Sequence, residues 1–67
     1  MQNDEIVANA LEQLLLNQTA LRAAIEEVSS WVAQRGSVNT HENVLMALHA
    51  LDAGSVSIVE SIEKLRS

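Results

Sequence analysis

The residues with the clearest potential for chemistry are His41, Glu42, His49 and Asp52. Imidazole and carboxylate groups are common metal ligands, but a protein site needs three or four of them close together. On a helix, His49 and Asp52 would face one another across a turn, whereas His41 lies two turns away. The spacing therefore predicts no metal site and no cofactor.

Hydroxyl side chains are more numerous, yet none has a neighbour that would activate it as a nucleophile. Ser29, Ser30 and Thr40 lie in no motif that pairs a hydroxyl with a general base. The two glycines are isolated, so no phosphate-binding loop is present. We therefore expect the protein not to be an enzyme.

The 67 residues are enough for one domain, residues 1–67. A domain this small buries only about 60% of the surface that its unfolded chain exposes, so it needs additional support. The chain has no cysteine, which removes disulfides. Oligomerisation is the remaining support, and it predicts a homodimer.

Charge and composition limit the classes of partner. The net charge of −5 comes from nine acidic and four basic residues, which argues against direct binding to nucleic acid or anionic lipid. The first residues lack the basic and apolar segments of a signal peptide, and the longest apolar run, residues 44–48, is too short to span a membrane. We expect a cytoplasmic protein whose partner has a basic or apolar docking surface.

Two segments show the periodicity of amphipathic helices, and no proline interrupts them. Asn3 can cap the first helix, and Gly36 after Arg35 can end it. Asn39 and Glu42 fit a capping box at the start of the second helix. The prediction is an all-α, antiparallel two-helix hairpin with helices over about 3–35 and 40–66 and a turn at 36–39.

Apolar residues recur at alternating spacings of three and four in both helices. In an antiparallel pair the two series match in reverse order, and every facing pair is centred on residue 38, inside the predicted turn. The predicted hairpin core is Val7, Leu11, Leu14, Leu21, Ile25, Val28, Val32, Val44, Leu48, Leu51, Ile58, Ile62 and Leu65.

Three residues interrupt this pattern. Gln18 and Ser55 are polar, and either they fix the register as buried polar groups or they reach solvent at a thin part of the bundle. Gly54 weakens the second helix, because glycine costs about 1 kcal/mol relative to alanine in a helix. A break there, with a third helix after it, is the alternative to one continuous helix.

Apolar residues outside the core predict a second buried face. Pairing two hairpins into a four-helix bundle would bury them; a docking face for another protein is the alternative. Trp31 is either an anchor for that protein or a plug at the loop end of the core. The candidate dimer or partner face is Leu15, Leu16, Trp31, Leu45, Met46, Val56 and Val59.

Five acids have no role at a helix end: Glu12, Glu26, Glu27, Asp52 and Glu63. They form either a solvated surface or a docking surface for a basic protein face, such as the DNA-binding face of a regulator.

A small acidic chain built from a long helix, the turn sequence Gly36-Ser37-Val38-Asn39 and a second helix resembles the small phage-encoded proteins that sequester host regulators, including the quorum-sensing anti-activators. The resemblance covers size and architecture. It implies a homodimeric inhibitor that binds a LuxR-type transcription activator in the host cytoplasm. The alternatives are a structural, assembly or chaperone-like bundle subunit and, disfavoured by the few basic residues, a nucleic-acid-binding dimer.

Overall fold

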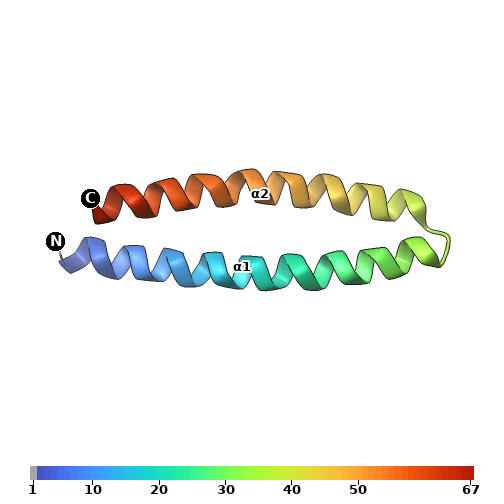
Figure 1. Ribbon diagram of the computed structural model, residues 1–67, viewed down its shortest axis with the longest axis horizontal. Helices are drawn as coiled ribbons and strands as arrows, with labels where there is room; N and C mark the ends of the chain where they lie inside the picture. Colours follow the sequence, from blue (N-terminus) through green and yellow to red (C-terminus); the bar gives the residue numbers. More distant parts are fainter. Residues whose placement is uncertain (1) are drawn as a thin grey trace.

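The computed structural model describes residues 2–67, with side chains from residue 3 onward. Two helices, α1 (Gln2–Gln34) and α2 (Val38–Arg66), run antiparallel and place both ends of the chain at the same end of the molecule (Figure 1). The molecule measures 52 × 16 × 10 Å. The prediction of an all-α two-helix hairpin is confirmed.

Residues 35–37 reverse the chain through a Schellman motif. Gly36 has a φ of 101°, a conformation that glycine adopts without steric cost. The Ser37 amide donates to the Val32 carbonyl at 3.1 Å, and the Gly36 amide donates to the Ala33 carbonyl at 3.0 Å. These bonds satisfy carbonyl groups that the end of α1 would otherwise leave free.

The turn lies at residues 35–37, one to two residues earlier than the predicted 36–39, and the predicted capping box does not form. α2 begins at Val38, with Ser37 at the N-cap and no bond from its side chain to the backbone. The Schellman motif leads straight into the new helix, and the His41 amide already donates to the Ser37 carbonyl at 3.2 Å. Asn39 therefore lies inside the first turn, where it cannot act as the N-cap.

α2 is continuous through Gly54, so the alternative with a third helix is wrong. The Ser55 hydroxyl donates to the Leu51 carbonyl at 3.1 Å, which satisfies this polar group within the helix. The side chain of Ser55 is half-buried.

At the interface between the helices, α2 contributes the predicted residues. α1 contributes a different set, because it is rotated about its axis relative to the prediction. The buried or half-buried positions of the α2 series are Val44, Leu48, Leu51, Ser55, Ile58, Ile62 and Leu65. Those of α1 are Ala8, Leu11, Leu15, Gln18, Arg22, Ser29, Val32 and Ala33.

Part of the predicted core is therefore wrong. Five of its residues on α1 are 44–61% exposed: Val7, Leu14, Leu21, Ile25 and Val28. We call the predicted α1 positions Val7, Leu14, Leu21 and Val28 the Leu14 series, and the buried or half-buried positions Ala8, Leu15, Arg22 and Ser29 the Leu15 series. One residue turns a helix by about 100°, and positions such as Leu11 and Gln18 belong to both patterns. The side of α1 that faces α2 is therefore rotated by roughly 50° from the predicted one. The small side chains of Ala8 and Ser29, both buried, lie where α1 meets α2, and this rotation places the larger Leu14 series at one side.

Replacing Gly54 by alanine should raise the free energy of unfolding by up to about 1 kcal/mol, because alanine restricts the unfolded chain and favours the helix. A Cβ atom at this position meets nothing within 4 Å. Gly36→Ala is the matched control and should be destabilising, because its φ of 101° strains any L residue. Urea unfolding followed by circular dichroism, at one protein concentration, would measure both; a loss for Gly54→Ala would contradict the prediction.

Candidate functional site

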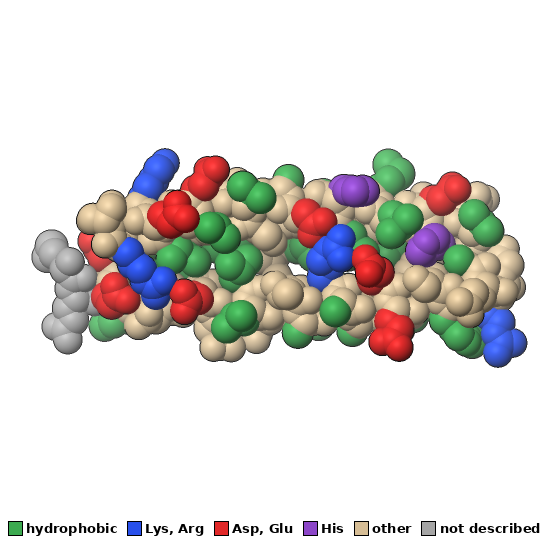
Figure 2. All heavy atoms as spheres, viewed as in Figure 1, with side chains coloured by type: hydrophobic (Ala, Val, Ile, Leu, Met, Phe, Trp, Pro, Cys, Tyr) green, Lys and Arg blue, Asp and Glu red, His purple; other side chains and the backbone are tan. Residues whose placement is uncertain are grey.

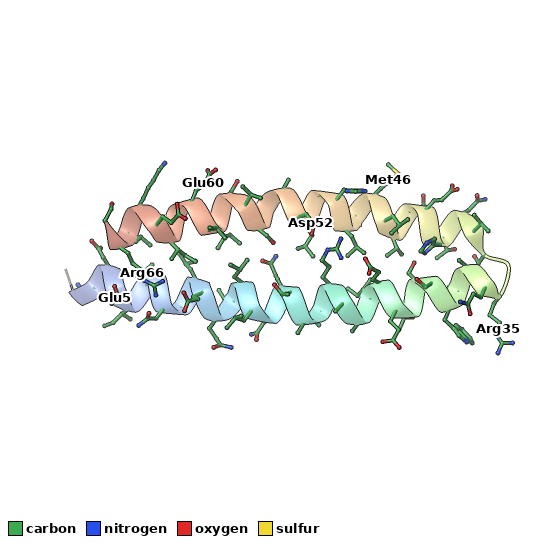
Figure 3. The ribbon with its side chains drawn as sticks, in the orientation of Figure 1. Glu5, Arg35, Met46, Asp52, Glu60 and Arg66 are labelled. Atoms are coloured by element: carbon green, nitrogen blue, oxygen red, sulfur yellow. The ribbon has the colours of Figure 1, made fainter. Side chains whose placement is uncertain are left out.

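One face of the hairpin carries ion pairs that join the two helices. Arg22 on α1 donates from Nε to Asp52 Oδ1 at 2.7 Å and from Nη2 to Asp52 Oδ2 at 3.0 Å. Its Nη1 donates to Glu26 Oε2 at 2.9 Å. Asp52 points from α2 into the space between the helices, as Figure 3 shows. This two-bond geometry is the strongest arrangement available to an arginine and a carboxylate.

Arg66 makes the corresponding contact near the chain ends. Its guanidinium reaches Glu12 at 2.8 Å, Asn9 at 2.7 Å and Glu5 at 3.2 Å. In Figure 2 the basic and acidic side chains of these contacts lie along the line between the helices. We call Arg22, Glu26, Asp52, Arg66, Glu5 and Glu12 the ionic face.

These contacts shift the pKa values of their members. The hydrogen bond from Arg22 lowers the pKa of the Asp52 carboxyl, with smaller contributions from the charges of Arg22 and His49. The bonds to Asp52 and then to Glu26 raise the pKa of Arg22, and the bond to Glu12 does the same for Arg66. Each shift stabilises the charged form, so the pairs persist at neutral pH.

The predicted acidic docking residues are consequently divided. Glu12, Glu26 and Asp52 bind arginines of the same chain. Glu27 and Glu63 are exposed and form no ion pair within the described residues 3–67. Only the latter two carry charge that is not already compensated by a direct partner.

The opposite face is apolar. Val7, Leu14, Leu21 and Val28 recur every seven residues along α1, on the side of the α2 contact away from the ionic face, and each is 47–61% exposed. We call this series, with its α2 neighbours Val44, Leu51, Ile58 and Leu65, the apolar face. None of its members is charged.

An open groove of about 360 Å³ lies on the apolar face near the loop. It is lined by Ala24, Ile25, Val28, Ser29, Val32, Thr40 and Val44. Ile25 and Val28, predicted for the hairpin core, therefore border an open depression between the helices. Such a depression is suited to aliphatic side chains.

The residues predicted for a dimer or partner face differ in their exposure. Leu15 and Leu45 are half-buried at the contact between the helices. Leu16, Met46, Val56 and Val59 are exposed elsewhere. Met46 points away from α1 in Figure 3. Leu15 and Leu45 therefore belong to the contact within the hairpin, and the exposed members remain candidates for a dimer or partner surface.

Trp31 is 55% exposed near the loop. The Arg35 guanidinium lies over its ring, 4.9 Å from the centroid. Within the single chain Trp31 therefore does not plug the core. Its ring combines a cation–π contact with an accessible apolar surface.

Two polar groups suggested by the sequence are involved in structural contacts. Ser29 Oγ lies 2.8 Å from His41 Nδ1, and Ser29 is only 3% exposed. The contact joins the two helices beside the groove that Ser29 helps to line. Among the described residues no three His, Asp or Glu side chains lie close enough to hold a metal ion.

α2 is long and apolar enough to cross a membrane by length and composition. Asp52 lies near its middle and is tied to Arg22 on α1. A carboxylate at the centre of a membrane span costs about 2.5–3.5 kcal/mol, which disfavours that location for α2.

No family model matches the chain, and no curated protein or solved structure matches it either.

Replacing Gln18 by leucine should raise the free energy of unfolding by about 1–3 kcal/mol, because a buried polar atom without a partner pays its full desolvation cost. Gln18 Oε1 is buried between the helices and has no hydrogen-bond partner within the described part of the chain. Chemical unfolding would measure the change, with exposed Gln13→Leu as the control. A destabilised Gln18→Leu protein would contradict this interpretation.

Asp52→Asn should destabilise the hairpin at pH 7, because it removes the charge that Arg22 binds. Folding lowers the pKa of Asp52 below its ordinary value of 3.8, so the pair stabilises above that pH and its contribution is lost as the pH falls through the folded-state pKa. The difference in unfolding free energy between wild type and Asp52→Asn should therefore shrink in acid. Glu63→Gln, which removes an unpaired acid, should show little difference at either pH.

Proposed function

We propose that the protein is a non-enzymatic, homodimeric interaction module that binds another protein and inhibits it, with a transcription activator as the favoured target. Exposed apolar surface carries this proposal. Only Ala8, Leu48 and Ile62 among the described apolar residues are buried, whereas twelve large apolar side chains are exposed. Leu14, Leu21 and Val28 form an exposed row along α1, and contiguous exposed apolar surface is typical of interaction sites.

The charge supports a protein partner in preference to nucleic acid. The chain has nine acids against four bases, and Arg22 and Arg66 are already bound to acids of the same chain. Glu27 and Glu63 stay available to a basic surface. Electrostatic complementarity of this kind speeds association and selects the partner, while apolar anchors supply affinity.

A structural or assembly subunit, or a chaperone-like bundle, is the alternative. It would use the apolar surface for constitutive assembly and would depend little on the acids. A location at a membrane is a further outcome to test, because α2 satisfies the length and composition of a span.

Trp31→Ala should reduce affinity for the target by at least tenfold, because a tryptophan hot spot contributes about 2 kcal/mol or more. Dimer mass and melting temperature should stay unchanged, since Trp31 is exposed in the hairpin. The immobilised chain would be used to capture proteins from a lysate of its natural host, and the captured protein would then be purified and titrated. Retardation of its DNA site, with and without the chain, would measure inhibition.

Met46→Ala is the matched control, because Met46 is more exposed than Trp31 and points away from α1. Capture of only the chain itself would contradict the inhibitor proposal and favour the structural alternative. Flotation with liposomes instead would indicate a membrane protein.

A further inference from the structure

We infer that the apolar face is the dimer interface. A second copy of this chain covers it and uses its own apolar face for the contact. This inference rests on the homodimer in the proposed function and names the surface that forms it. The ionic face would then stay in water on the outside of a four-helix bundle.

Surface area favours a second copy as the occupant. A folded monomer of 7.3 kDa is expected to expose about 4,200 Å². The hairpin exposes 5048 Å². The excess of about 900 Å² is close to the roughly 800 Å² that each partner buries in a standard interface. The radius of gyration is 15.5 Å, whereas a compact domain of this length has about 11 Å. The hairpin is therefore also more extended than a compact monomer.

The distribution of charge indicates which face of the hairpin the second copy covers. Each copy carries a net charge of −5, so two copies repel wherever their acids approach one another. The apolar face has no charged member, and Glu5, Glu12, Glu26 and Asp52 all lie on the ionic face. Contact through the apolar face therefore keeps these four acids of each copy away from the interface.

The shape of the apolar face suits a symmetric contact. Leu14, Leu21 and Val28 form a row along α1, and the groove near Val44 lies at its loop end. In a two-fold dimer each copy offers the same row and the same groove, so one set of aliphatic side chains can pack against the other. When two copies pair, the residues of this face become buried. They are residues that the sequence periodicity assigns to a core.

Leu21→Glu tests the assignment, with Leu16→Glu as the matched control. The two leucines are 61% and 58% exposed, so neither change disturbs the hairpin contact, but only Leu21 belongs to the apolar face. Light scattering after size exclusion should give twice 7.3 kDa for wild type and Leu16→Glu, and 7.3 kDa for Leu21→Glu. A dimeric Leu21→Glu protein together with a monomeric Leu16→Glu protein would overturn the inference.

A second measurement covers the case in which the separated hairpin unfolds. The chain has no cysteine, so Leu21→Cys and Leu16→Cys each introduce a single thiol. Alkylation of the thiol at position 21 should slow by about tenfold or more from dilute to concentrated protein, because it reacts only when the interface opens. The thiol at position 16 should react at one rate; the reverse pattern would overturn the inference.

The outcomes also separate this inference from the proposed function. A wild-type protein that is monomeric at every concentration would refute the homodimer itself. A dimer whose thiol at position 21 stays reactive would refute only the apolar face as the interface and leave the homodimer in place.

Discussion

Two helices in contact touch along only one line, and this limit governs the rest of the structure. Only a narrow stripe of side chains on each helix can contact the other helix. In this chain the stripe buries few apolar side chains fully, namely Ala8, Leu48 and Ile62. The remaining aliphatic residues need another contact, while Arg22 and Arg66 join the helices from one side. The hairpin therefore leaves most of its large aliphatic side chains outside the contact between the helices.

The sequence predicts the helices and their order, but it does not determine how α1 is rotated about its axis. Apolar spacing favours the series through Leu14, because the series through Leu15 that the structure buries includes the polar residues Arg22 and Ser29. The structure buries the second series, and in this rotation Arg22 lies beside Asp52. A search for facing charges of opposite sign would have found this pair, whereas apolar periodicity alone cannot.

The predicted start of the second helix differs from the observed one for another reason: two local sequence signals favour different start positions. Asn39 and Glu42 favour one helix start, and Gly36 favours a tight reversal that begins the helix earlier. The backbone bonds of Ser37 and Gly36 satisfy carbonyl groups of α1, and the second helix begins directly after them, ahead of Asn39. By contrast, continuity through Gly54 was predicted, because the apolar spacing does not shift there.

The rotation of α1 separates two kinds of surface that the sequence pattern had merged. With the Leu15 series buried, acids and arginines share one face, and aliphatic residues share the other. Two copies joined through the apolar faces would double the net charge of −5 on one particle. Such a particle would attract a basic protein surface more strongly than either copy alone, so the proposed dimer would favour the proposed target binding.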